Sequence, residues 1–328
     1  MSKITIIGGS GFVGTNLCRQ LAQKQKQFEI LDINQSREFP EKCKIADVRD
    51  FDSLCENITG DIVINLAAVH RDNVRDKTEY WKTNVTGAEN VARACESLGI
   101  KKIIFTSSVA VYGFAEPGTD EHGKINPFND YGKTKYEAEE KLRKWQSIGD
   151  RKLIIIRPTV IFGEGNRGNV YNLINQIASN KFMMIGKGEN VKSIAYIGNI
   201  VAFIEKTIDS SIDYGIYNYV DTPNLKMNDL VSEIRKFLGK NKGRNLRMPY
   251  LIALVLGYIA DGIATLTKRD LLLSSIRVKK FVASTEFRSD KNSLDGFEAP
   301  FTLEEALNRT IKSEFLEKNS THQIFYTE

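Results

Sequence analysis

The chain of 328 residues is poor in cysteine and histidine, with four of the first and three of the second. Cys18, Cys43, Cys55 and Cys95 stand far apart and form no C-x-x-C pair, so the sequence indicates neither a disulfide framework nor a zinc site. We therefore predict reduced thiols and no bound metal.

A strong charge imbalance and an amino-terminal signal are also missing. The 46 basic and 41 acidic side chains are spread along the chain without the clustered basic face of a nucleic-acid binder, so we expect no nucleic-acid partner. The chain enters the apolar run Ile4–Ile7 within three residues and leaves no room for a cleavable signal, which favours a cytoplasmic protein.

One segment, residues 250–266, is rich in Leu, Ile and Ala. Its uncharged part ends at Asp261 and is shorter than the roughly 20 residues that a spanning helix needs. The segment predicts a buried or pocket-covering helix and no stable membrane insertion, with peripheral membrane contact as the alternative.

Residues 1–160 alternate short β-branched runs with longer amphipathic stretches, as β-α-β units do. The candidate strands are 4–7, 28–31, 44–46, 62–65, 103–106 and 153–156. Several are apolar at consecutive positions, which indicates a sheet covered on both faces. We predict an α/β fold: a Rossmann-type doubly wound parallel sheet over 1–160, a smaller carboxyl-terminal α/β substrate lobe over 161–316, and a polar tail over 317–328.

A glycine-rich turn, Gly8, Gly11 and Gly14, follows the first strand and precedes a helical stretch. This spacing lets the backbone approach a pyrophosphate, which a helix amino terminus stabilises. Asp32, at the end of the second strand, can accept from both ribose hydroxyls of NAD and repels the 2′-phosphate of NADP. The pattern predicts NAD, and the alternative is a glycine-rich turn beside an ordinary surface aspartate.

Small and polar residues follow the next two strands. Asp47 and Val48 come after the third, where Asp47 could accept from the adenine amino group. Leu66, Ala67 and Ala68 come after the fourth, where small side chains let a flat cofactor lie close to the backbone.

The sequence Tyr131-Gly132-Lys133-Thr134-Lys135 carries the chemistry that we consider most informative. Tyr131 and Lys135 are four apart and share a helix face, so the ammonium can lie near the phenol and lower its pKa. A hydroxyl of Ser107 or Ser108 can bind the same substrate oxygen. Such a group moves a proton at a carbinol while a nicotinamide exchanges a hydride at the attached carbon. An exposed tyrosine with a solvated lysine is the alternative interpretation.

In these segments, and in residues 81–91, the chain resembles the extended short-chain dehydrogenases, in particular the NAD-dependent nucleotide-sugar epimerase/dehydratase family, over residues 1 to about 315. The resemblance implies that Ser108, Tyr131 and Lys135 are catalytic and that Asn84 closes the proton-relay side of the site. It also implies a set of NAD contacts: Gly8, Gly11, Phe12, Val13, Gly14, Asp32, Asp47, Val48, Leu66, Ala67, Ala68, Asn84, Ser107, Tyr131, Lys135, Pro158 and Val160.

Dehydratases of this family carry an acidic pair just after the catalytic hydroxyl, where this chain has Val109 and Ala110. Dehydration is therefore not expected. We predict a nucleotide-sugar 4-epimerase, with a 4-keto-sugar reductase or dehydrogenase as the alternative. A hydroxysteroid-type dehydrogenase, suggested by residues 250–266, and a non-catalytic NAD-binding protein stay open.

The expected substrate is a nucleotide sugar, with UDP as the favoured nucleotide and polysaccharide biosynthesis as the setting. Its candidate contacts are Ser108, Thr159, Lys192 and Arg277, of which Arg277 could equally be a solvated surface arginine. Relatives commonly form dimers through two helices, here 79–98 and 131–145, so we expect a homodimer. Tyr80, Trp81, Val85 and Val91 could serve that contact or face the sheet.

Overall fold

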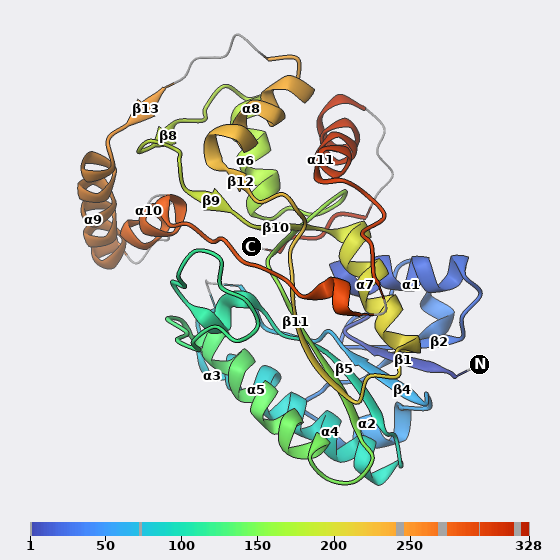
Figure 1. Cartoon of the computed structure of the whole chain (residues 1–328). Helices are drawn as coiled ribbons and strands as arrows, with labels where there is room; N and C mark the ends of the chain where they lie inside the picture. Colours follow the sequence, from blue (N-terminus) through green and yellow to red (C-terminus); the bar gives the residue numbers. More distant parts are fainter. Residues whose placement is uncertain are drawn as a thin grey trace.

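The structure is a computed structural model that describes residues 2–71, 74–240, 246–267, 274–294, 296–317 and 323–327. Its centre is a seven-stranded parallel sheet in the order β11-β6-β5-β4-β1-β2-β3 (Figure 1). The strands are β1 (Ile4–Ile7), β2 (Phe28–Asp32), β3 (Cys43–Ile45), β4 (Ile62–Asn65), β5 (Lys102–Thr106), β6 (Lys152–Pro158) and β11 (Tyr214–Tyr219). The predicted doubly wound sheet is confirmed, with a seventh strand that the sequence did not suggest.

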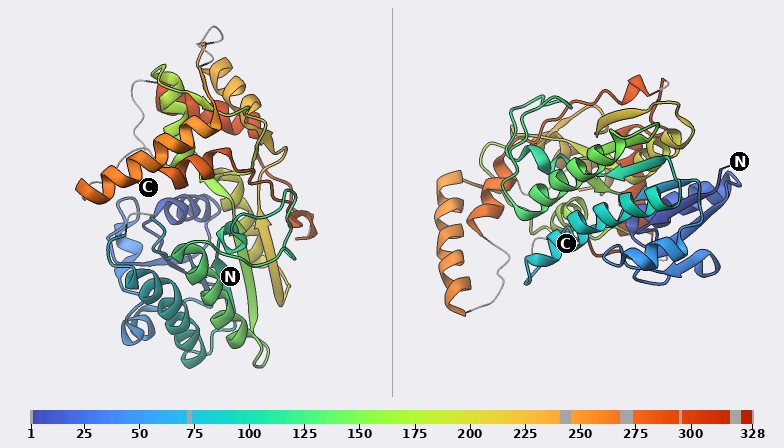
Figure 2. Two further views of the ribbon diagram at one scale, coloured as in Figure 1. Left: turned by 90° about the vertical axis from the view of Figure 1, so that its left-hand side faces the viewer. Right: turned by 90° about the horizontal axis from the view of Figure 1, so that it is seen from below.

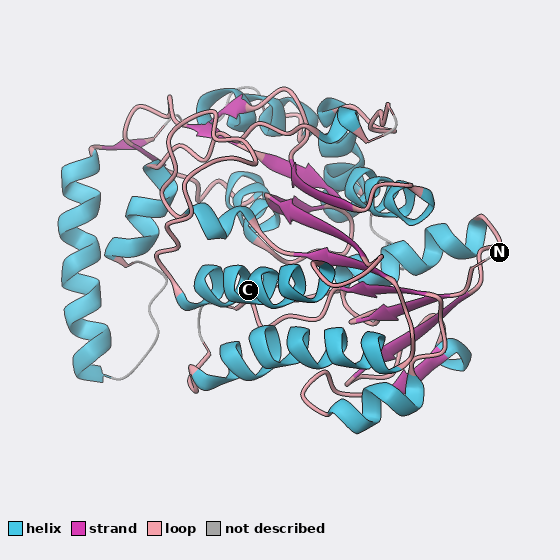
Figure 3. Ribbon diagram, turned by 60° about the horizontal axis from the view of Figure 1, so that its bottom comes forward, coloured by secondary structure: helices cyan, strands magenta, loops and turns pink. Residues whose placement is uncertain are grey.

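Helices cover both faces of this sheet (Figure 3). They are α1 (Phe12–Gln23) and α7 (Ile197–Asp209) on one face, and α2 (Phe51–Asn57), α4 (Gly87–Ser97) and α5 (Asp130–Gln146) on the other. Alternate side chains of one strand enter the two cores, because Ile6 packs with Leu17 of α1 and Ile7 packs with Val91 of α4. Apolar runs in the strands therefore follow from two-sided burial.

The rest of the chain forms a smaller lobe, which lies above the sheet in Figure 1. Its helices are α6 (Asn169–Ala178), α8 (Met227–Phe237), α9 (Tyr250–Thr267), α10 (Ser275–Val282) and α11 (Leu303–Ile311). Its paired strands are β7 (Val160–Phe162) with β10 (Ile194–Tyr196), β9 (Val191–Lys192) with β12 (Leu225–Lys226), and β8 (Met184–Ile185) with β13 (Arg247–Met248). Two elements that the sequence placed in this lobe, α7 and β11, join the first sheet instead.

Short helical elements complete the fold. They are α3 (Thr78–Tyr80), the π-helical turns η2 (Trp81–Thr86) and η5 (Lys312–Leu316), and the 3-10 turns η1 (Pro40–Lys42), η3 (Val109–Tyr112) and η4 (Lys291–Ser293). All four cysteines are free thiols.

Helix α9 projects from the side of the smaller lobe, as both views of Figure 2 show. Only Ala253 and Gly257 of its 18 residues are buried. The prediction of a buried or pocket-covering helix is therefore wrong. The helix itself forms where it was predicted, but apolar composition alone does not place a helix in a protein core.

The side chains considered for a dimer contact are used mostly within the chain. Tyr80, Val85 and Val91 are buried at 2%, 8% and 0% exposure. Trp81 is half-buried and donates to Glu137 Oε2 on α5 at 3.2 Å. These residues hold α5 against η2 and α4, so dimerisation remains an expectation that rests on the resemblance.

Candidate active site

The glycine turn joins the end of β1 to the start of α1. Gly8 adopts a φ of +79°, and a Cβ there would lie 2.7 Å from the backbone nitrogen of Ala67. A Cβ on Gly14 would lie 2.5 Å from the carbonyl oxygen of Gly8, so both positions need glycine. Gly11 is the N-cap of α1, and no side chain among the described residues caps this helix. Its first-turn N–H groups are therefore disposed for an anion such as a pyrophosphate.

Asp32 ends β2 beside this turn. Its carboxylate accepts from the backbone N–H of Ser10 at 3.0 Å and from that of Asn34 at 2.9 Å. Burial raises the pKa of Asp32, and the two backbone donors oppose that shift. Backbone donors thus fix the carboxylate at the carboxyl edge of the sheet, the position that selects a ribose diol.

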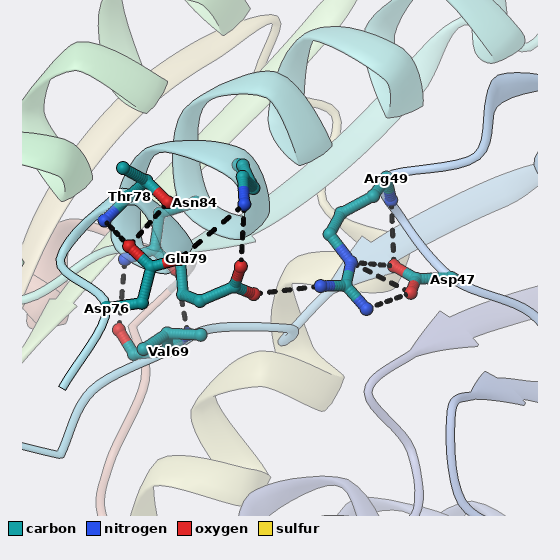
Figure 4. A network of polar contacts seen from close by, with 8 residues as sticks. Asp47, Arg49, Val69, Asp76, Thr78, Glu79 and Asn84 are labelled. Carbon is teal, nitrogen blue, oxygen red and sulfur yellow. Dashed lines mark hydrogen bonds and ion pairs between the residues drawn. The ribbon is translucent and has the colours of Figure 1, made fainter. Parts of the chain in front are cut away.

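Asp47 lies after β3 and is held by Arg49, as Figure 4 shows. The guanidinium of Arg49 reaches Asp47 Oδ2 at 2.6 Å and Glu79 Oε2 at 2.8 Å, and its hydrogen bonds lower the pKa of Asp47. Val48 is buried, and its carbonyl accepts from Asn90 Nδ2 at 3.0 Å. The ion pair ties the loop after β3 to the start of α3, which the sequence did not predict.

The loop after β4 brings Leu66, Ala67 and Ala68 beside the glycine turn. The N–H of Leu66 donates to the carbonyl of Ile7 at 2.8 Å, which keeps the two strand ends together. His70 lies two residues after Ala68. Desolvation lowers the pKa of His70, and the positive charges of Arg71 and Lys135 lower it further. His70 therefore lies near Lys135, although nothing in the sequence singled it out.

Asn84 lies on the π-helical turn η2 and is 2% exposed. Its Oδ1 accepts from the N–H of Val69 at 2.8 Å, and its Nδ2 donates to the carbonyl of Val69 at 3.0 Å (Figure 4). Nδ2 also donates to Thr134 Oγ1 at 3.0 Å. π-helical turns are rare and are frequent at functional sites. Here the turn lets Asn84 join the loop after β4 to α5, the helix that carries Tyr131 and Lys135.

Ser107 and Ser108 follow β5. Ser107 is 2% exposed, and its Oγ has no hydrogen-bond partner among the described residues. Ser108 is the N-cap of η3, where its Oγ accepts from the N–H of Ala110 at 3.1 Å. A buried hydroxyl without a partner is costly, so Ser107 points to a polar ligand that belongs in this site.

Tyr131 and Lys135 lie one turn apart on α5, which begins at the side-chain cap of Asn129. Burial raises the pKa of Tyr131 to about 12, and the side chain of Ser108 opposes the shift by hydrogen bonding to the phenol. Burial lowers the pKa of Lys135 to about 7, and the charge of Glu139 opposes it. Ser108 and Tyr131 are in contact and Lys135 lies one turn away, but the expected lowering of the Tyr131 pKa by Lys135 is wrong, because burial disfavours charge at this site.

Behind Lys135 lies a buried charge network that the sequence did not reveal. Glu139 Oε2 meets Arg157 Nη2 and Arg143 Nη2, each at 2.6 Å. Arg157 also donates to Tyr112 Oη at 2.7 Å and is 1% exposed. The position of Glu139, four residues after Lys135, was a possible signal, but Arg157 comes from β6 and only packing shows the pair. The network fixes α5 against the sheet.

The strand boundary at Pro158 and Val160 lies where the two lobes meet. Pro158 ends β6, and Val160 begins β7 with 41% exposure. Between them, the N–H and the hydroxyl of Thr159 both donate to the carbonyl of Tyr219, at 3.0 and 3.1 Å. Thr159 thus joins β6 to β11 and is 7% exposed, and its predicted contact with substrate stays a prediction.

Lys192 and Arg277, the two candidate phosphate contacts, are both associated with α10. Lys192 Nζ donates to the carbonyls of Lys280 at 3.0 Å and Ala283 at 2.7 Å, at the carboxyl end of that helix. Burial lowers the pKa of Lys192 to about 8. Arg277 is exposed on the first turn of α10.

The end of the chain returns to the cofactor side, although the sequence predicted a polar tail over 317–328. The ring centroid of Phe325 lies 5.6 Å from that of Phe12 at the glycine turn. Its N–H donates to the carbonyl of Gly165, and Arg71 donates to the carbonyl of Tyr326 at 2.9 Å. Residues 323–327 thus connect the two lobes beside the first turn of α1.

The residues predicted to bind NAD gather at one edge of the sheet. The glycine turn, Asp32 and the loop after β4 come from neighbouring strands, and Ser107 supplies an unpartnered buried hydroxyl. The tight glycine cradle and this hydroxyl fit a dinucleotide. Val13 packs against the core beside them.

Comparisons with known proteins agree with this geometry. Residues 4–219 match the NAD dependent epimerase/dehydratase family. The chain is 47% identical, over 99% of both chains, to an N-acetyl-alpha-D-glucosaminyl-diphospho-ditrans,octacis-undecaprenol 4-epimerase of Escherichia coli O157:H7. It is 30% identical to a UDP-glucose 4-epimerase of Vibrio cholerae, over 63% of this chain and 66% of that one.

Solved structures share the fold. A UDP-glucose 4-epimerase of Thermus thermophilus in complex with NAD matches with a TM-score of 0.72 and 16% identity, over 94% of this chain and 98% of that one. The predicted cofactor, NAD, and the predicted epimerase or oxidoreductase class of enzyme are confirmed by the family match and the full-length relative. The chain belongs to the NAD-dependent epimerase/dehydratase family, within the extended short-chain dehydrogenases.

Proposed function

We propose that this chain is an NAD-dependent 4-epimerase of a sugar carried on a diphosphate, and that the carrier is a polyprenyl lipid. The observation that carries the reaction is the group of half-buried Ser108 and Tyr131 and buried Lys135, with Val109 and Ala110 after Ser108 in place of an acid-base pair. It provides one proton-transfer group at one carbinol, which suits epimerisation and lacks the extra acid and base of a dehydration.

Tyr131 is the group that holds and moves the proton. Burial keeps the phenol of Tyr131 neutral, and a positive charge near it, on Lys135 or on the nicotinamide, would favour the phenolate that accepts the proton of the C4 hydroxyl. Ser108 binds the same oxygen and keeps it within reach of the phenol. NAD, held by the glycine turn and Asp32, would supply the reversible hydride transfer at C4 that lets the hydride return to the other face of the sugar. Tyr131 then returns the proton, so the reaction is balanced without another reactant.

The carrier follows from the relatives. The nucleotide-sugar 4-epimerase expected from the sequence agrees with the UDP-glucose 4-epimerase of Vibrio cholerae, which aligns with 63% of this chain. The relative that aligns with 99% of this chain acts on a sugar joined through a diphosphate to undecaprenol. In both carriers the sugar is joined through a diphosphate. The lipid carrier accounts better for helix α9, whose apolar side chains are exposed. The UDP-sugar is our second candidate substrate.

Lys192 and Arg277 remain candidates for the diphosphate. Both are basic and both lie at α10, but Lys192 already binds two carbonyl oxygens at the end of that helix. Lys192 would therefore position α10, and Arg277, exposed on the first turn of that helix, remains a candidate for direct contact. The expected homodimer, the cytoplasmic location and a role in polysaccharide biosynthesis complete the proposal.

A substrate panel tests the function. Purified chain is incubated without added cofactor with either UDP-N-acetylglucosamine or polyprenyl-diphospho-N-acetylglucosamine in detergent, and the sugar is released and analysed by chromatography. We expect the galacto epimer from the lipid-linked sugar, and the same equilibrium ratio when the reaction starts from that epimer. If the chain converts a 4-keto-sugar, and does so only when NADH is supplied, it is a keto-sugar reductase and the epimerase proposal is wrong.

A further inference from the structure

Helix α9 exposes large apolar side chains along one broad face. Eight of them have exposed fractions between 40% and 86%: Leu251, Ile252, Val255, Leu256, Tyr258, Ile259, Ile263 and Leu266. By length and composition the helix is apolar enough to cross a membrane, with a mean hydropathy of 1.7. An apolar face this wide is normally covered by a protein core or by lipid, and no core covers it within the described residues.

The one covered side of α9 is built from small residues. Ala253 and Gly257 are one turn apart and face α10, and a Cβ on Gly257 would lie 2.8 Å from Ser275 Cα. Asp261, the single charged residue of α9, accepts from the N–H of Ser275 at 3.2 Å. The small residues and the aspartate thus serve the contact with α10, and the large apolar residues are left for another partner.

The surroundings of α9 are basic. Residues 246–282 contain six basic side chains and two acidic ones. Helix α10 carries Arg277, Lys279 and Lys280 and contains no acidic residue, and Lys279 lies 5.4 Å from the ring of Tyr258 on α9. An apolar helix beside an excess of positive charge is complementary to an anionic lipid surface.

We propose that α9 and α10 together form a membrane-docking unit that seats the smaller lobe on an anionic bilayer surface. This proposal rests on the proposed function, because an enzyme needs to bind a membrane if its substrate is a polyprenyl-linked sugar held there. The partner is the lipid surface, and the apolar side chains of α9 enter its interfacial region.

Helix α9 lies on the membrane and does not cross it. Its amino end follows β13, which pairs with β8 of the smaller lobe. After α9 the chain packs as α10 along the same helix and continues to Thr285, which pairs with Lys192. Both ends of α9 are therefore attached to the same lobe, which suits a helix that lies on the membrane surface.

An apolar surface leads from this unit toward the catalytic helix. Lys280 of α10 lies 5.5 Å from the ring of Phe128, which stacks on Phe114 with 4.6 Å between ring centroids. The two rings are 39% and 52% exposed. Phe128 directly precedes Asn129, the cap of the helix that carries Tyr131. This aromatic pair is placed to guide the lipid end of the substrate between membrane and site.

Vesicle sedimentation of the full chain tests the docking unit. Vesicles of phosphatidylglycerol and phosphatidylethanolamine are compared with vesicles of phosphatidylcholine. The test variant is Val255→Glu/Ile259→Glu, at positions 58% and 54% exposed, and the matched control is Leu98→Glu/Ile148→Glu, at positions 42% and 54% exposed outside α9. We expect the wild type and the control to bind the anionic vesicles, and the α9 variant to bind them roughly tenfold or more weakly.

Activity separates this inference from the proposed function. The α9 variant should lose activity on polyprenyl-diphospho-N-acetylglucosamine in vesicles and keep it on a short-chain, water-soluble analogue. Equal vesicle binding by the wild type and the α9 variant would overturn the docking unit, even if the enzyme epimerises the lipid-linked sugar in detergent. Vesicle binding without any epimerisation would remove the proposed function and leave the docking unit in place. A change from dimer to monomer in light scattering, with vesicle binding intact, would overturn the inference in favour of a second copy of the chain.

Discussion

Helices α5 and α9 depart from the usual distribution of side chains in opposite ways. Helix α5 has nine charged residues out of 17, yet it buries Lys135 and Glu139 completely. Helix α9 has one charged residue out of 18, yet it exposes nearly all of its apolar side chains. Buried charge and exposed apolar surface each lower stability in water. Retaining them indicates that the first serves chemistry and the second serves a non-aqueous partner.

The two helices should therefore respond differently to mutation. A change in the buried face of α5 should alter the reaction with every substrate, whether soluble or held in a bilayer. A change on α9 or on the aromatic pair Phe114 and Phe128 should alter only the reaction at a membrane.

The largest effect is expected at the phenol of α5. Tyr131→Phe should lower kcat by roughly 10²–10⁴-fold, because it removes the general acid-base group. The loss should be equal for soluble and lipid-linked sugars, and it should be measured by steady-state kinetics with both. Unchanged kcat would force a non-catalytic NAD-binding role or a different site.

Breaking the network behind α5 should lower stability. Arg157→Met leaves the buried Glu139 without its bidentate partner, and removing one member of such a pair costs about 3 kcal/mol in free energy of unfolding. Arg143→Met is the control, because its partly exposed side chain should contribute less than about 1 kcal/mol. Urea unfolding followed by fluorescence measures both. Equal, small losses in the two variants would show that the network does not hold α5.

Lys135 gives a pH-dependent test of buried charge. Its pKa falls from the ordinary 10.5 to about 7, so between these values the unfolded chain binds more protons than the folded one, and stability rises with pH. Lys135→Met removes the cost of burying the ammonium, which is fully present below pH 7. We expect the variant to have a higher Tm than the wild type at pH 6 and the difference to shrink by pH 9.5. A difference that does not change with pH would contradict the burial of Lys135.

The smallest effect is expected at the aromatic pair between α10 and α5. Phe114→Ser/Phe128→Ser should raise KM for the vesicle-held sugar by several-fold and leave KM for the water-soluble analogue unchanged, because it shortens the apolar path without touching Tyr131. Steady-state kinetics with the vesicle-held sugar and with the water-soluble analogue measure both KM values. An equal rise in both KM values would place the pair in the sugar site itself.

Much of the catalytic half could be predicted because its signals are local. The strands are visible in the sequence as apolar runs, and the glycine turn lies between a strand and a helix. The spacing of Tyr131 and Lys135 is enough to place them on one helix face. Asp32 was found in the same way, at the end of a strand at a typical distance from the glycines.

The rest depends on contacts between distant parts of the chain. Arg157 meets Glu139 only because β6 packs on α5, and Lys192 meets the end of α10 from 88 residues away. The π-helical turn at Asn84 and the return of Phe325 to Phe12 carry no local signal. For α9 the sequence predicted the helix, but whether protein or lipid covers it depends on where the neighbouring elements lie.

The central claim, epimerisation at C4 by Tyr131 with a retained cofactor, is tested most directly with a substrate deuterated at C4. Polyprenyl-diphospho-N-acetylglucosamine carrying this label is converted in vesicles without added nicotinamide, and both sugars are analysed by mass spectrometry. We predict that the galacto epimer forms and keeps the deuterium, because the hydride leaves C4 and returns to it. A galacto epimer that has lost the label, or no product until NADH is added, would contradict the account.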